Sequence, residues 1–166
     1  KMRIQCRKAG FNGLRIIACM DGLDPALGRQ IAESGWDAVS GYNLSTAAKP
    51  IGLDPAGLAY RDHKDVLNRY KQIWIDRNAS TGNLPDIPNI VMGRDDRGWE
   101  RIKPGKGSYI ADPKASNFEA ACRDAKELVD AKPADRWDSK IVVFDNWTEF
   151  GEGHYIEPTT GTGFTF

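Results

Sequence analysis

The stretch Ile141-Val142-Val143-Phe144-Asp145-Asn146 decides the fold class of this chain, because it is a short apolar run that ends in polar residues. Such runs are typical of parallel strands that are buried on both faces of a sheet. Weaker strand patterns are found at residues 14–20, 37–42 and 90–92. Between the strands, apolar residues at helical spacing predict helices over residues 25–34, 56–78 and 118–131.

Strands that alternate with helices predict a parallel α/β fold built from (β/α) units. Two arrangements fit this pattern, a doubly wound sheet and part of a (β/α)8 barrel. No glycine-rich phosphate-binding motif follows the first strand, which disfavours a nucleotide-binding sheet. A complete barrel needs about 250 residues, whereas this chain has 166. We therefore expect residues 1–166 to form one partial catalytic domain, the C-terminal half of a TIM-type (β/α)8 barrel truncated at both ends.

Composition and spacing exclude several classes of function. The 23 basic and 23 acidic residues cancel, so charge gives no reason to expect a nucleic-acid partner. No apolar run in the sequence approaches the roughly 20 residues that a membrane span needs. The His, Cys and Asp residues lack metal-ligand spacing, and no Gly-x-Ser-x-Gly elbow supports a serine triad. We therefore expect no metal, no cofactor and no membrane partner.

Glu149 and Glu152 follow the clearest strand and stand three residues apart, so a helical turn would bring them onto one face. Glycosidic bond cleavage typically uses two carboxyl groups, one that donates a proton and one that activates water or attacks the sugar. Trp147 and Phe150 supply an apolar wall of the kind that alters carboxyl ionisation. The segment predicts a catalytic carboxylate pair, and the competing interpretation is a solvated acidic loop.

Polar and aromatic residues after the predicted strands are candidates for binding sugar hydroxyls or stacking on sugar rings. The candidates are Asn146, Trp147, His154, Tyr155, Glu157, Arg94, Asp95, Trp99, Tyr42 and Asn43. Structural roles compete for two of them: Arg94 could pair with a nearby carboxylate, and Asp95 could cap a turn. His63 lies in a charged run on a predicted helix, so we expect it at the surface.

The segment from Asn146 to Pro158 resembles the N-E-W-x-E-G…EP signature of the WbsX-like and glycoside hydrolase family 99-like barrels. It is also similar to the W-N-D-(Y/F)-G-E-S-H-Y-I-G-P segment of family 71 α-1,3-glucanases. Gly93-Arg94-Asp95-Asp96-Arg97-Gly98-Trp99 looks like the G-W-D-x-R-x-W segment of WbsX-like proteins, and residues 35–42 resemble their GFDA…Y strand. Together these matches cover most of the chain, in the expected order.

The resemblance implies a (β/α)8 barrel that cleaves α-linked glycans, with an extracellular or periplasmic location favoured. It implies that Glu152 is the general acid/base and that Glu149 assists the sugar 2-hydroxyl, which gives retention. The family 71-like pattern instead implies inversion. The chain departs from the WbsX-like pattern at Thr148, Phe150 and Arg94, which stand where Asn, Trp and Trp are usual. An arginine at this place adds a charged donor, which suits an anionic sugar.

The expected partners are a carbohydrate substrate and the remaining half of the barrel, supplied by the parent chain or by a second copy. Two other functions stay open. A glycosyltransferase-like role in polysaccharide assembly follows from the WbsX-like label, but the sequence has no D-x-D motif at a strand end. A non-catalytic glycan-binding role is favoured if the piece is natural as it stands, because a half-barrel has exposed strand edges.

Overall fold

The structure is a computed structural model that describes residues 1–43, 47–82, 84–98, 107–145, 147–161 and 163–165. Its helices are α1 (Met2–Lys8), α2 (Pro25–Glu33), α3 (His63–Ser80) and α4 (Ala115–Asp130), with the 3-10 turns η1 (Asp96–Gly98) and η2 (Phe150–Glu152). Its strands are β1 (Ile17–Cys19), β2 (Ala38–Ser40), β3 (Gly52–Leu53), β4 (Ala59–Asp62), β5 (Asp86–Ile87), β6 (Asn89–Ile90), β7 (Ser108–Ala111), β8 (Val143–Phe144), β9 (Thr148–Glu149) and β10 (His154–Tyr155).

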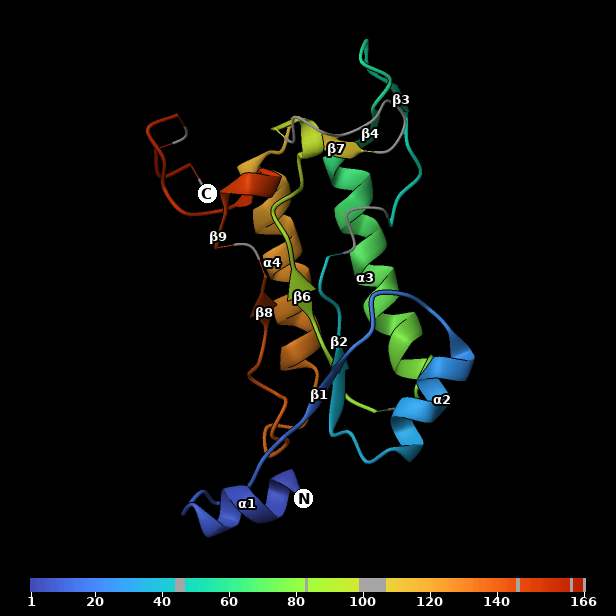
Figure 1. Cartoon of the computed structure of the whole chain (residues 1–166), viewed down its shortest axis with the longest axis vertical. Coiled ribbons are helices and arrows are strands. Elements are labelled where there is room, and N and C mark those ends of the chain that lie inside the picture. Colours follow the sequence, from blue (N-terminus) through green and yellow to red (C-terminus); the bar gives the residue numbers. More distant parts are fainter. Residues whose placement is uncertain (44–46, 83, 99–106, 146, 162, 166) are drawn as a thin grey trace.

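Short parallel strands form the centre of the molecule (Figure 1). β1 pairs with β2, β2 pairs with β5, and β6 pairs with β8, all in parallel. β5 and β6 are two halves of one extended segment, divided by Pro88. Proline has no N–H to donate, but the Pro88 carbonyl accepts a hydrogen bond from the Val143 N–H at 2.9 Å. One segment therefore contributes to both parallel ladders.

The parallel strands of the two central ladders follow in space the order that they have in the sequence: β1, β2, β5 with β6, then β8. A doubly wound sheet reverses its strand order at a switch point, whereas successive units of a (β/α) barrel keep it. The predicted parallel α/β class is confirmed in its coarse form, a mixed α/β fold with small parallel sheets. Within the described ranges these strands do not close into a barrel.

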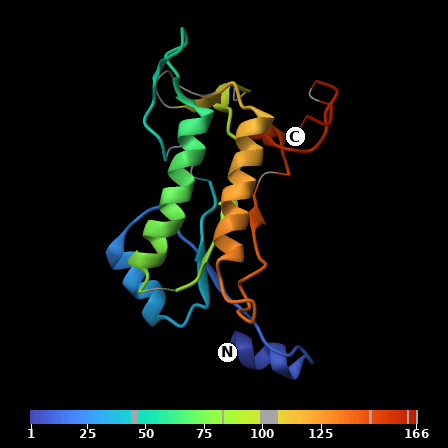
Figure 2. The same cartoon turned by 180° about the vertical axis from the view of Figure 1, so that it is seen from behind.

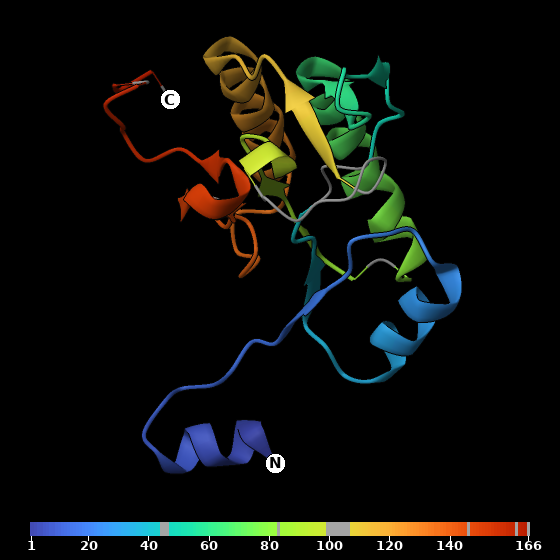
Figure 3. The same ribbon diagram turned by 45° about the horizontal axis from the view of Figure 1, so that its top comes forward.

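Helices α2, α3 and α4 cover one side of the central parallel strands, whereas α1 lies apart from them (Figure 1). Figure 1 views the molecule from the strand side, and Figure 2 shows α3 and α4 in front of the strands. From above, α2, α3 and α4 form an arc around the outside of the strands (Figure 3). α2 packs on α3 and α3 packs on α4. No helix in the part of the chain that the structure describes has the length and apolar character that crossing a bilayer requires.

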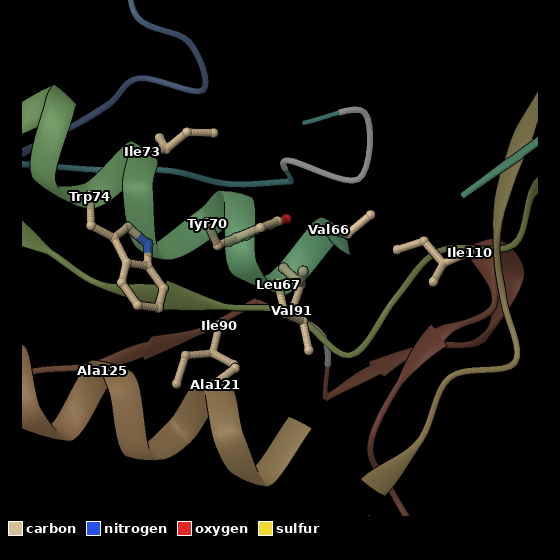
Figure 4. Close-up of a cluster of buried hydrophobic side chains, with 10 residues drawn as sticks. All are labelled: Val66, Leu67, Tyr70, Ile73, Trp74, Ile90, Val91, Ile110, Ala121 and Ala125. Atoms are coloured by element: carbon tan, nitrogen blue, oxygen red, sulfur yellow. The ribbon is translucent and has the colours of Figure 1, made fainter. Parts of the chain in front are cut away.

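The main core fills the space between α3, α4 and the segment formed by β6 and the two residues that follow it. Its buried members are Val66, Leu67, Tyr70, Ile73, Trp74, Ile90, Val91, Ile110, Ala121 and Ala125 (Figure 4). The rings of Tyr70 and Trp74 meet edge to face, with their centroids 6.4 Å apart. The small side chains of Ala121 and Ala125 allow α4 to approach this aromatic face closely.

A buried ion pair connects α3 to the central strands. The Arg77 side chain is fully buried, and its Nη2 donates to Asp86 Oδ1 at 2.9 Å. Its Nε also donates to the Asp86 carboxylate, and its Nη1 donates to the Met20 carbonyl at 2.8 Å. Such a bidentate pair fixes both direction and register. It therefore holds α3 in place against β1 and β5.

A second small sheet contradicts two of the sequence predictions. β3 pairs antiparallel with β4, and β4 pairs in parallel with β7. Because residues 59–62 form β4, α3 begins at His63 and not at residue 56. The stretch 96–115, for which the sequence predicts neither a helix nor a strand, contains η1 and β7. Tyr60 and Tyr109 are register partners and their rings stack 5.8 Å apart, which stabilises a pairing between distant parts of the sequence.

The expectation that His63 lies at the surface is wrong. His63 is 1% exposed, and its Nδ1 accepts a hydrogen bond from the Lys114 N–H at 2.9 Å. It stands three residues before Val66 and four before Leu67, which are both buried. Helical spacing therefore places His63 on the buried face of α3.

Candidate functional site

Polar residues follow the described parallel strands at their carboxyl ends, where (β/α) enzymes hold their reactive groups. Asp21 follows β1 and accepts a hydrogen bond from the N–H of Tyr42, which follows β2. Partial burial raises the pKa of the Tyr42 hydroxyl, and the carboxylates of Glu149 and Glu152 raise it further. Asp21 therefore joins the ends of β1 and β2, and the charges of the two glutamates act on the Tyr42 hydroxyl.

The two glutamates lie on a tight hairpin, residues 148–155, which we call the carboxylate hairpin. β9 and β10 pair antiparallel, with Glu149 opposite His154. Gly153 turns the chain with φ +56°, in the left-handed region that favours glycine. Glu149 precedes η2 and Glu152 ends it. Only Glu152 has 3-10 geometry, because Glu149 is the last residue of β9, so the two side chains do not lie on one face of a regular helical turn.

Arg94 connects the end of β6 to the carboxylate hairpin. Its Nη1 donates to Glu152 Oε2, and its Nε donates to Asp96 Oδ1 at 2.7 Å. Asp96 is held in turn, because its Oδ2 accepts the Ser108 N–H at 3.0 Å. The pairing of Arg94 with nearby carboxylates, one of the two roles considered for it, is therefore present in the structure.

Asp95 fixes the hairpin through its backbone and caps a turn with its side chain. Its N–H donates to the Glu152 carbonyl at 2.7 Å. Its Oδ1 accepts the Arg97 N–H at 2.9 Å, and its Oδ2 pairs with Arg97 Nη2 at 2.6 Å. The hydrogen bond from the Arg97 side chain lowers the pKa of the Asp95 carboxyl. A Cβ at Gly153 would come within 2.5 Å of the Asp95 Cβ, so the two segments touch closely.

His154 and Asp145 form a buried pair where the hairpin returns to β8. His154 Nε2 lies 3.5 Å from Asp145 Oδ1, and the two side chains are 0% and 5% exposed. In the described ranges, neither the ring nitrogens nor the carboxylate oxygens have a hydrogen-bond partner. Burial raises the pKa of Asp145, and His154 lowers it in part. The sequence predicts His154 as a sugar-binding residue, but here its ring does not reach solvent.

Asp145 is a functional candidate that the list of predicted site residues does not contain. Its position at the end of an apolar strand predicts burial, and a carboxylate buried with few partners marks many functional sites. Its charge also acts on the ionisation of Tyr42 and of Cys19, whose thiol pKa is raised first by burial. Asp145 is therefore one of the charged groups that influence the side chains at the ends of the parallel strands.

Exposed aromatic rings flank the two glutamates. Trp147 and Phe150 are 58% and 51% exposed. The rings of Phe150 and Tyr155 lie 4.8 Å apart and form one continuous apolar surface. Of the remaining predicted residues, Asn43 and Glu157 are half-buried. Asn146 and Trp99 lie outside the described residues.

A pocket of about 280 Å³ opens beside the carboxylate hairpin, between the end of β6, β7 and β10. Its polar lining includes Arg94, Asp95, Arg97, Asp112 and Tyr155. Three of the predicted binding residues, Arg94, Asp95 and Tyr155, therefore share one concave surface.

The described ranges hold no group of three or more His, Cys, Asp or Glu side chains that could bind a metal ion. Comparisons of the chain with protein-family models, with curated proteins and with solved structures found no match.

Proposed function

We propose that this chain is part of a glycoside hydrolase that acts on α-linked poly- or oligosaccharides, with Glu149 and Glu152 as its working carboxylates. The observation that carries this proposal is that both glutamates lie on a hairpin that follows the parallel strand β8, where Arg94, which follows β6, binds Glu152. Two carboxyl groups at such a place are the chemical requirement for cleaving a glycosidic bond.

The arrangement of strands supports the finer proposal of a partial (β/α)8 barrel. The strand order follows the sequence, and the helices cover one side only. Both are properties of consecutive barrel units. The resemblance of residues 146–158 to the WbsX-like and family 99-like signature leads to the same proposal, because that signature follows a barrel strand. The remaining strands would come from the parent chain or a second copy.

Exposed aromatic rings beside the carboxylates support a sugar as the ligand. Trp147, Phe150 and Tyr155 present apolar faces next to Glu149 and Glu152. The C–H face of a pyranose is apolar while its edge is polar, so a ring that stacks here would place its hydroxyls near charged groups. Arg94 and Asp95 in the adjacent pocket are donors and acceptors for those hydroxyls.

One observation favours a second candidate, a glycan-binding role without catalysis. Arg94 engages Glu152, one of the two carboxylates that catalysis needs. A carboxylate held in this way can orient sugar hydroxyls without exchanging a proton. The anionic-substrate version is less favoured, because Arg94 already pairs with Asp96 and Glu152.

The test is the release of reducing ends from a panel of α-linked glycans by the full-length protein. Glu149→Gln and Glu152→Gln should each lower the rate at least about 100-fold, the contribution expected of a positioned acid or base. Glu33→Gln, on the exposed end of α2, is the matched control and should keep the rate. Unchanged release in both active-site variants would reject the assignment. Binding of a glycan with no release by the wild type would favour the non-catalytic role.

A further inference from the structure

The carboxylate hairpin is attached to the parallel strands at its turn and at its base. At the turn, the Glu152 carbonyl accepts the Asp95 N–H at 2.7 Å, and the Glu152 carboxylate binds Arg94. At the base, His154, the first residue of β10, contacts Asp145, which directly follows β8. The base attachment therefore sets the direction in which the hairpin leaves the end of β8, while the turn attachment holds its far end against the end of β6.

The base contact bears directly on Glu149. His154 and Glu149 are register partners in the antiparallel pair of β9 and β10. Side chains that stand directly opposite one another on paired strands project to the same face of the pair, with their Cβ atoms about 5 Å apart. One face of the hairpin therefore carries Glu149 and, beside it, the imidazole that contacts Asp145. A shift of His154 would move Glu149 with it.

Stability alone does not account for this contact. The His154 and Asp145 side chains are 0% and 5% exposed, and within the described ranges their polar atoms have no hydrogen-bond partner. Burial raises the pKa of the Asp145 carboxyl, His154 lowers it in part, and the charge of Asp21 raises it again. Apolar side chains of similar volume often replace a buried ion pair with no loss of stability. A costly polar pair beside a working carboxylate is typical of a functional site.

We infer that Asp145 and His154 form a positioning pair for Glu149. Asp145 holds the imidazole at the end of β8, and His154 passes this position to the Glu149 backbone through the pairing of β10 with β9. Both side chains are buried, so the pair acts on the reaction through Glu149 and not through contact with a sugar. This inference rests on the proposed function, because it takes Glu149 as one of the two working carboxylates.

Steady-state kinetics of the full-length protein on an α-linked glycan test the pair. Asp145→Asn should lower kcat about 100-fold, the loss that a misplacement of about 1 Å can cause. KM should stay nearly unchanged, because the exposed rings and the pocket are not altered. His154→Gln keeps an N–H that can face Asp145, so it should retain part of the rate. The double variant should lose no more than Asp145→Asn alone, because the two residues act as one unit.

Urea unfolding separates positioning from a purely structural role. Asp145→Asn should keep or raise the urea midpoint while kcat falls, because it removes a buried charge. The matched control is Asp138→Asn, a fully buried carboxylate that pairs with Lys132 and Arg136 in the segment before β8. This control should show the reverse, a lower midpoint with an unchanged kcat. A fall of kcat and midpoint together in Asp145→Asn would overturn the inference, and so would a raised KM with kcat kept.

Hydrogen–deuterium exchange tests the anchor without any substrate. Asp145→Asn should speed the exchange of backbone amides in residues 147–155 and leave those of β4 and β7 unchanged. If the wild type cleaves no α-linked glycan, the proposed function fails, and the exchange data still decide whether the pair holds the hairpin. Unchanged exchange in the hairpin would overturn the inference even if the wild type is an active glycosidase.

Discussion

His154 Nε2 and Asp145 Oδ1 lie 3.5 Å apart, and both side chains are almost completely buried. The pair joins the end of β8 to the strand that returns from the carboxylate hairpin. A buried carboxylate that has no hydrogen-bond partner among the described residues destabilises the folded chain. Under the proposed function, this pair is a cost in stability that a functional site carries.

Asp145→Asn should unfold at the same or a higher urea concentration than the wild type at pH 7, because it removes a buried charge. Burial raises the pKa of Asp145 above 3.8, so the folded chain holds this proton more tightly than the unfolded chain. The wild type therefore gains stability as the pH falls through the folded pKa, and the gain is complete below 3.8. As the pH is lowered, the free energy of unfolding of the wild type should therefore rise relative to that of Asp145→Asn. A variant that is clearly less stable at pH 7 would contradict this account.

Asp37 gives the opposite pH dependence. Burial alone would raise its pKa, but the Ile16 N–H, at 2.8 Å, and the side chains of Arg3 and Arg15 lower it overall. The stability that Asp37 contributes is therefore present above the unfolded pKa of 3.8 and is lost as the pH falls through the lower folded pKa. Asp37→Asn should cost about 1–3 kcal/mol at pH 7, because a neutral amide oxygen accepts the Ile16 N–H and the arginine bonds more weakly than a carboxylate does.

Thermal unfolding at pH 7 and at pH 3 measures the contribution of Asp37. Asp135→Asn, at an exposed carboxylate, is the control and should change little. Arg3 and Arg15 are 41% and 58% exposed, and exposed ion pairs contribute little to stability. High salt screens these pairs, so it should remove only a small part of the effect of Asp37→Asn. An Asp37→Asn loss that persists unchanged at pH 3 would argue against the assigned hydrogen bonds.

Gly153→Ala should cost at least about 2 kcal/mol, because it adds left-handed strain to an overpacked contact. The new Cβ would meet Asp95 Cβ at 2.5 Å and push the hairpin away from β6. Gly151→Ala is the matched control in the same turn, since a Cβ there has no atom within 4 Å. Chemical denaturation of both variants makes the comparison. Equal losses at the two positions would show that the close approach to Asp95 does not matter.

Arg77→Met should cost about 3–5 kcal/mol, because it leaves the Asp86 carboxylate buried without its partner. Arg69→Met changes an exposed arginine on the same helix and should stay within about 0.5 kcal/mol of the wild type. Urea midpoints of the two variants give the measurement. Comparable small effects in both would mean that the buried pair is dispensable.

Much of this fold can be predicted from short stretches of sequence, because helix caps and buried strands each have a pattern of neighbouring residues. The Asp24 side chain accepts the Ala26 N–H at 2.8 Å and starts α2 as its type and position before Pro25 predict. Apolar runs located β1, β2, β6 and β8 to within a few residues. Helical spacing also places Arg77 on the buried face of α3, three residues after Trp74. The sequence does not show that its charge is paired there, because the partner Asp86 lies on a separate strand.

Pairings between distant segments were beyond the reach of local pattern. β4 and β7 have no periodic signal strong enough to distinguish them from a helix start and a loop, and the contact between Tyr60 and Tyr109 stabilises them only after folding. The candidate site shows the same division. The placement of Glu149 and Glu152 after a strand was visible in the sequence. The contact of Arg94 with Glu152 and the burial of Asp145 with His154 depend on how separate strand ends meet.

Pro88 also has a consequence for the geometry of the site. Tyr42 extends from the ladder of β1, β2 and β5, whereas the carboxylate hairpin extends from the ladder of β6 and β8. The ring of Pro88 fixes its φ angle where the shared segment passes from one ladder to the other. The next residue, Asn89, donates from its side-chain amide to the Tyr42 carbonyl at 2.9 Å. The end of the first ladder is therefore attached to the start of the second, and the direction of Tyr42 depends on a strand that lies in the other ladder.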